Sequence, residues 1–211
     1  MSNKNIICID AGHGGVQPGA VNGTLGYMEK TIALDISLKV RDYLLYAYKD
    51  SSNNLIIEDV CNHPHEPLVD VLMTRKGDVD VSLKDRCLLA NKEKATFFIS
   101  IHCNSCKTSG PSGIETWHYT TSQDKPKQLA DNIQKSMMEM VKPFSINGQP
   151  IKSRGVKSNN TYYTLRHTIM PSIVVECGFM SNNDEVKLMY ENESYRIALA
   201  KGITKGILLS L

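Results

Sequence analysis

The chain has 211 residues, of which 41% are hydrophobic and 22% are charged, a composition typical of a globular domain. A chain of this length buries roughly 70% of its unfolded surface, so we expect a single domain, residues 1–211, whose core needs no disulfides. The formal net charge of +2 does not favour nucleic acid as a partner, and no apolar run is long enough for insertion into a membrane.

Strand and helix patterns alternate along the chain. This predicts an α/β fold, with a largely parallel twisted sheet and helices on both of its faces. The apolar residues 6–11 predict a buried strand, and residues 12–26 form a glycine-rich loop. A helix is predicted to begin near Glu29, because apolar residues then recur with the helical period: Ile32, Ile36, Val40, Tyr43, Leu44 and Ala47.

Residues 49–67 have the least regular pattern. Leu55–Val60 fit a strand, and the proline-rich residues 61–67 fit an exposed turn. The segment is longer than a simple connection between strand and helix requires. We therefore expect an inserted hairpin or flap within the single domain.

The middle of the chain repeats the strand and helix pattern. Val69–Thr74 predict a strand, and Ser82 is predicted to cap a helix because Asp85 follows three residues later. Strands are predicted at residues 96–101, where the apolar run ends at His102, and at residues 113–119. The inward face of the helix is predicted to carry Leu83, Cys87 and Ala90.

The last third of the chain begins with a long predicted helix, whose apolar face carries Leu129, Ile133, Met137 and Met140. Residues 143–160 contain several glycines and prolines and predict a surface loop. A strand at residues 172–176 and two helices, from about Asn183 and after Ser194, complete the expected domain. The final helix is predicted to pack through Leu199, Ile203 and Ile207.

Polar side chains with the chemistry of metal ligands follow three of the predicted strands. His13, His102 and Glu176 each come after an apolar run, and Glu29 begins the first helix. The carboxyl ends of parallel strands meet at one edge of a sheet, where the chemistry of α/β proteins is concentrated. A catalytic zinc ion takes three protein ligands and keeps one open position, and His13, Glu29 and His102 can supply that set. The alternatives are hydrogen-bonded surface histidines and, for Glu176, a fourth ligand or a buried ion-pair partner.

Four specific motifs surround these residues: Asp10–Gly15, Gly26–Lys30, Ser100–Ser105 and Val175–Asn182. Together they resemble the zinc-dependent N-acetylmuramoyl-L-alanine amidases of the type-3 group. The resemblance runs in order from about residue 5 to residue 210. It implies that His13, Glu29 and His102 bind Zn²⁺, that Glu176 is the catalytic carboxylate, and that peptidoglycan is the partner. The implied reaction cuts the amide bond between the lactyl group of muramic acid and the first L-alanine of the stem peptide.

Five other polar residues are candidates for supporting roles. Arg75 and Arg86 either form internal ion pairs, the favoured interpretation, or contact carboxylates of the stem peptide. Asn104 and Arg166 lie near the ends of motifs and could orient Glu176 or a ligand. Glu115 is an alternative carboxylate, but in an alternating strand it is predicted to face solvent.

The cysteines and the amino terminus bear on where the protein acts. We expect free thiols at all six cysteines, Cys8, Cys61, Cys87, Cys103, Cys106 and Cys177. No secretory signal is visible, which favours synthesis in the cytoplasm and action at the bacterial wall, as a phage or prophage lysin or as a domain of an exported enzyme. The competing functions are a zinc peptidase that cuts within the stem peptide and a noncatalytic wall-binding module. The sequence leaves host range and oligomeric state open.

Overall fold

The computed structural model describes residues 4–59, 66–120 and 124–211. Six strands form the main sheet in the order β4-β1-β5-β10-β6-β9. Every neighbouring pair is parallel except β10 and β6, so the predicted largely parallel sheet is confirmed. The strands are β1 (Ile6–Ala11), β4 (Asp70–Met73), β5 (Phe97–Asn104), β6 (Ile114–His118), β9 (Ser153–Ser158) and β10 (Ser172–Phe179).

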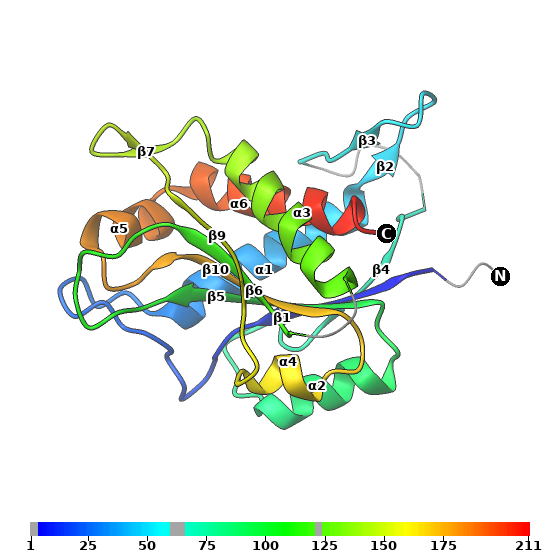
Figure 1. Cartoon of the computed structure of the whole chain (residues 1–211), viewed down its shortest axis with the longest axis horizontal. Helices are drawn as coiled ribbons and strands as arrows, with labels where there is room; N and C mark the ends of the chain where they lie inside the picture. The colour runs from blue at the N-terminus through cyan, green and yellow to red at the C-terminus, as the bar shows by residue number, and fades with distance from the viewer. Residues whose placement is uncertain (1–3, 60–65, 121–123) are drawn as a thin grey trace.

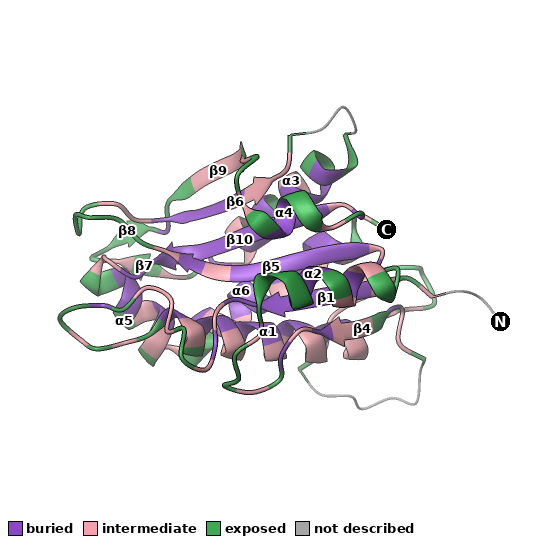
Figure 2. Ribbon diagram, turned by 90° about the horizontal axis from the view of Figure 1, so that it is seen from below, coloured by how far each residue is buried: buried purple, intermediate pink, exposed green. Residues whose placement is uncertain are grey.

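Helices cover both faces of this sheet (Figure 1). One face packs against α1 (Glu29–Tyr46), α3 (Lys125–Met140) and α6 (Glu193–Leu208), with α5 (Asn183–Glu191) beside α6. The opposite face carries α2 (Leu83–Lys92) and the short α4 (Tyr163–His167), and Figure 2 views the molecule from this side. The apolar stripes of α1 and α6 enclose the larger core, in which Ile36, Leu199 and Ile203 are fully buried.

Capping residues set the beginnings of several helices. The Ser82 side chain accepts a hydrogen bond from the backbone N–H of Asp85, as predicted for α2. Asn182 caps α5 and Asn192 caps α6 in the same way. Leu83 was wrongly predicted to face the core, since its exposed fraction is 51%. It is the first residue of α2 and lines the pocket described below.

Residues 143–160 were wrongly predicted to form only a loop. They contain the hairpin of β7 (Ser145–Ile146) and β8 (Gln149–Pro150), followed by the edge strand β9. The apolar alternation is absent from β9, because an edge strand with one open face needs few buried side chains. In the same way, β5 continues past the predicted end, so His102 lies inside the strand rather than after it.

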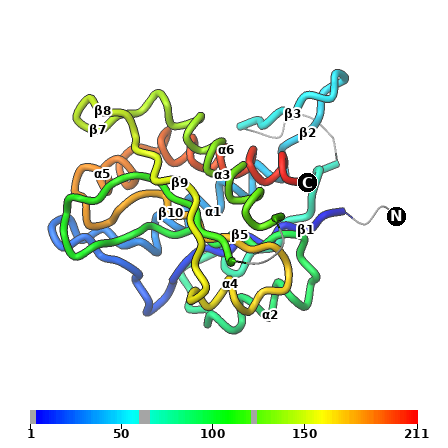
Figure 3. The backbone as a smooth tube through the Cα atoms, viewed as in Figure 1, coloured from blue at the N-terminus to red at the C-terminus, as the bar shows by residue number. Residues whose placement is uncertain are grey.

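The segment that begins at residue 49 contains part of a second hairpin. Strand β2 (Tyr48–Lys49) pairs with β3 (Leu55–Ile56), and Asp50 accepts backbone hydrogen bonds from Ser52 and Asn54 in the turn. Figure 3 places this hairpin and the β7–β8 hairpin at opposite ends of the view. The turn predicted at residues 61–67 lies mostly outside the described residues, and the role of the segment as an insertion stays a prediction.

Candidate functional site

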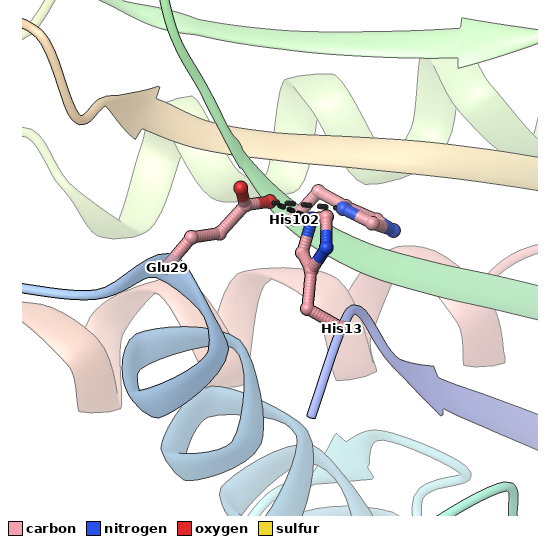
Figure 4. Close-up of side chains that lie close together, drawn as sticks. All are labelled: His13, Glu29 and His102. Carbon is pink, nitrogen blue, oxygen red and sulfur yellow. Dashed lines mark hydrogen bonds and ion pairs between the residues drawn. The ribbon is translucent and has the colours of Figure 1, made fainter. Parts of the chain in front are cut away.

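Three side chains with the chemistry of metal ligands meet at the carboxyl end of the central strands. His13 follows β1, Glu29 is the first residue of α1, and His102 lies in β5 (Figure 4). The distance from Glu29 Oε1 is 3.1 Å to His13 Nε2 and 2.9 Å to His102 Nδ1. One ligand atom from each residue lies within 4.8 Å of the others. The structure thus brings together the three residues that the sequence singled out.

The glycines of the loop permit this close approach. A Cβ on Gly12 would lie 2.4 Å from Cε1 of the His102 ring. At Gly19, which has a φ of +70°, a Cβ would lie 2.6 Å from both Glu29 Oε2 and His13 Cδ2. His13 itself has a φ of 58°, a left-handed conformation that few residues other than glycine adopt. The loop sequence is therefore fitted to the packing around the cluster.

The Glu29 carboxylate is held ionised at the centre of the cluster. Its residue is 4% exposed, and its oxygens also accept hydrogen bonds from the backbone N–H groups of Ala20 and Cys103. Burial would raise the pKa of Glu29, but the hydrogen bonds with His102 and His13 hold that pKa well below its usual range. For His102, burial lowers the pKa, whereas the Glu29 carboxylate raises it to about 9.

This donor set fits a zinc ion. Two imidazole nitrogens and one carboxylate oxygen are typical zinc ligands, and three protein ligands leave one coordination position open for water or substrate. A second buried carboxyl group lies next to the cluster, as expected for a catalytic site rather than a closed structural one. The observed ligand chemistry therefore supports a metal centre.

Glu176 is that second carboxyl group. It pairs with His102 across β10 and β5, and it is 7% exposed. Among the described residues, no hydrogen-bond partner lies within reach of its Oε2 atom. Burial raises the pKa of Glu176 to about 7; His102 opposes this rise, and the carboxylates of Glu29 and Glu115 reinforce it.

Glu176 and the two histidines line a pocket of about 250 Å³. Because a carboxyl with a pKa near 7 can both accept and donate a proton near neutral pH, this pocket is equipped for general acid–base chemistry. Tyr162 also lines the pocket, and no motif in the sequence marked it. The remaining lining residues are Leu83, Tyr163, Thr164 and Val174.

Arg75 and Arg86 make internal contacts. Arg86 forms an ion pair of 2.7 Å with Asp10, and its Nη2 donates to the carbonyl oxygen of His13. Arg75 donates to the carbonyl oxygens of Ala11 and Gly12. Both arginines are buried, so their contacts fix the backbone that carries His13.

The surroundings of Glu115, Asn104 and Arg166 differ from those that the sequence suggested. Glu115 was wrongly predicted to face solvent, since it is 1% exposed and pairs with Arg154 and Lys157 of the unpredicted strand β9. Asn104 donates to Glu115 rather than to Glu176. Arg166 is exposed on α4, and within the described ranges no hydrogen bond or ion pair joins its side chain to Glu176 or to the three ligands.

The described cysteines are all free thiols, and Cys61 lies outside the described residues. Of these, only Cys106 is exposed. None of the described helices combines the length and the apolar character needed to cross a membrane.

Comparisons with known proteins identify the family of the chain. The family described as N-acetylmuramoyl-L-alanine amidase matches residues 7–208. The endolysin of Bacillus phage SPP1 is 32% identical over 206 residues, which are 97% of this chain and 65% of that protein. The chain thus spans slightly less than two thirds of the endolysin. The germination-specific N-acetylmuramoyl-L-alanine amidase of Bacillus subtilis is 28% identical over 99% of this chain and 80% of that protein.

A solved structure is also similar over nearly the whole chain. The crystal structure of N-acetylmuramoyl-L-alanine amidase from Clostridium difficile 630 matches with a TM-score of 0.80 and 33% identity, covering 99% of this chain and 97% of that one. The family match extends over almost the full sequence and includes every residue of the site. The chain therefore belongs to the N-acetylmuramoyl-L-alanine amidase family.

Proposed function

We propose that the protein hydrolyses the amide bond between the lactyl group of N-acetylmuramic acid and the first L-alanine of the peptidoglycan stem peptide. The main support is one observation: His13, Glu29 and His102 converge within 4.8 Å, next to the buried carboxyl of Glu176, whose Oε2 atom has no hydrogen-bond partner among the described residues. Membership of the amidase family supports the choice of bond.

We further propose that His13, Glu29 and His102 hold Zn²⁺. Bound there, the ion would act as a Lewis acid that polarises the amide carbonyl. The role of the chain itself is to fix the two imidazoles and the carboxylate. The hydrogen bonds from Ala20 and Cys103 keep the Glu29 carboxylate oriented for this purpose.

Glu176 then acts as the general base and the general acid. It removes a proton from the water whose oxygen forms a bond with the carbonyl carbon. As the bond between carbon and nitrogen breaks, Glu176 returns that proton to the departing amine of L-alanine. The products are a lactyl carboxylate and a free peptide amino terminus. Such a positioned group typically contributes about 10²–10⁴-fold to the rate.

The proposed place of action is the bacterial cell wall. Two relatives bear the names endolysin and germination-specific amidase. Either a phage lysin or the catalytic part of an exported enzyme accords with the site.

Product analysis on purified cell walls tests the proposal. We expect new amino-terminal L-alanine and intact glycan strands, together with loss of activity after chelation and recovery with added zinc. The His102→Ala variant should not recover, because it lacks one ligand. Release of any other new amino terminus would indicate a peptidase, and wall binding without new termini would indicate a noncatalytic module; either result would overturn the proposed reaction.

A further inference from the structure

An open face of the sheet continues from the candidate active site onto β6 and β9. Helix α3 packs against one face of these two strands, where Thr116 is fully buried. Neighbouring residues of a strand point to opposite faces, so Glu115 and Trp117 lie on the other side. Glu115 pairs with Glu176 in the sheet, and Trp117 pairs with Lys157. Residues of β10, β6 and β9 therefore form one surface.

Two cations of this surface contact a single buried carboxylate, that of Glu115. Both Arg154 and Lys157 contact the same oxygen of Glu115, the Arg154 Nε at 2.7 Å. The other oxygen accepts hydrogen bonds from Asn104 and Trp117. All four contacts converge on one buried carboxylate. Two further carboxyl groups lie nearby: Glu176 pairs with Glu115 in the sheet, and burial raises the pKa of Glu185, a rise that Arg154 opposes. What remains unused at this surface is therefore hydrogen-bonding capacity.

The two cations are fixed in place but remain partly accessible. The side chain of Arg154 is 26% exposed and that of Lys157 is 33% exposed. The Arg154 guanidinium lies 4.8 Å from the centre of the Phe179 ring, and the Lys157 ammonium lies 5.1 Å from that of Trp117. In the described part of the chain, no hydrogen bond involves the two terminal nitrogens of Arg154. Because the Arg154 side chain is held in place and its terminal N–H groups are unused, it is preorganised to bind an anion.

Aromatic side chains link this surface to the pocket. Tyr162 lines the pocket beside Glu176 and meets Trp117 edge to face, with ring centres 5.9 Å apart. Strand β9 lies two strand spacings from β10, which is about 10 Å. An extended peptide covers about 3.5 Å per residue, so that distance corresponds to two or three residues.

On the opposite side of the cluster, the described cations are already engaged. Lys30 is paired with Asp78 at 2.8 Å, and Arg75 and Arg86 are buried against backbone carbonyls. Arg166 on α4 is exposed, and among the described residues no hydrogen bond or ion pair holds its side chain in place. Among these cations, those of β9 are the ones that are both held in place and partly exposed. A peptide bound through these cations would run from the pocket across the sheet towards β9.

We propose that Arg154 and Lys157 form a subsite for a carboxylate of the stem peptide, two or three residues beyond the bond that is cut. This inference rests on the proposed amidase function and adds to it a preference for acidic stem peptides. A peptide carboxylate suits the subsite, because it is anionic and planar and can bind the paired donors of a guanidinium.

The test compares two muramoyl peptides that differ only at the second or third residue, which carries either a free carboxylate or a carboxamide. The measured quantity is the ratio of kcat/KM for the acid to that for the amide. This ratio is independent of the fraction of folded enzyme, so loss of stability alone does not change it. We expect the wild-type protein to favour the acid about tenfold, the lower end for a hydrogen bond to a charged group, because both cations are partly exposed.

In Arg154→Gln the ratio should fall close to one, and Arg154→Lys should keep part of the preference. Lys205→Gln removes the same charge from a partly exposed ion pair with Glu139 on the far side of the protein, and its ratio should match the wild type. An unchanged ratio in both Arg154→Gln and Lys157→Gln, or a wild-type ratio near one, would overturn the subsite. If neither substrate releases amino-terminal L-alanine, the proposed function itself fails, which is a different outcome.

Discussion

Replacement of Arg86 by methionine removes the cation of the ion pair with Asp10 while keeping an apolar stem of similar length. The two residues are 2% and 1% exposed, and the shortest distance between their charged groups is 2.7 Å. Removal of one partner from a buried ion pair typically costs about 3–5 kcal/mol of stability, because the other charge stays buried. Ser100 and Thr74 still donate to Asp10, so we expect a loss near the lower end, about 3 kcal/mol.

The pH dependence provides a second signature. Burial would raise the pKa of Asp10, but Arg86, Ser100 and Thr74 hold that pKa below its usual value. The ionised carboxylate thus stabilises the wild-type fold above about pH 4, and this contribution is lost as the pH falls through the lower native pKa. Without Arg86 the native pKa of Asp10 rises, so protonation relieves the buried charge. The difference between variant and wild type should be largest at neutral pH and smaller below about pH 4.

Urea unfolding at several pH values measures both effects. Domains of this kind have total stabilities of about 5–15 kcal/mol, so the variant should still fold, with a lower midpoint and an unchanged slope. Asp10→Asn in the Arg86→Met background should recover part of the loss, since it removes the unpaired charge. A loss below about 1 kcal/mol at pH 7, or one that stays constant down to pH 4, would refute the reasoning.

Two further variants test the site and the core separately. Glu176→Gln should retain zinc but lose at least ~10² in hydrolysis rate, measured together with metal content; near-normal turnover would contradict the assigned role. Gly206→Ala should destabilise the protein by about 1–2 kcal/mol in urea unfolding, because its Cβ would lie 2.4 Å from the Ile133 Cα in α3. The cost of separating the helices exceeds the gain of up to about 1 kcal/mol in helix propensity, and increased stability would show that the packing argument is wrong.

The candidate ligands could be predicted from the sequence because they lie beside recognisable strand and helix patterns. His13 and His102 were located because buried strands have recognisable apolar runs, and Glu29 because a periodic helix begins there. Parallel pairing then brings the strand ends together regardless of their separation along the chain. The same rules also gave the order of helices and strands, apart from the edge strand β9 and the short elements β2, β7, β8 and α4.

The burial of Glu115 could not be predicted from local sequence patterns. Alternation along a strand tells which residues share a face, but not what covers that face. Arg154 and Lys157 lie in a strand without an apolar pattern, so neither their position beside Glu115 nor its burial could be read from local sequence. The same limit applies to Tyr162, whose place in the pocket depends on how α4 packs on β10.

The three candidate ligands come from a loop, a helix start and a central strand that meet only when β1, α1 and β5 have assembled. An incompletely folded chain therefore offers at most isolated donors, with none of the chelation that the native arrangement provides. A cation captured by the finished cluster would stabilise the native state alone, by an amount that grows with the logarithm of its free concentration. A higher concentration of the free ion would then lower the fraction of unfolded protein. Because proteases cut the unfolded chain, the metal-bound protein would be degraded more slowly where the ion is more abundant.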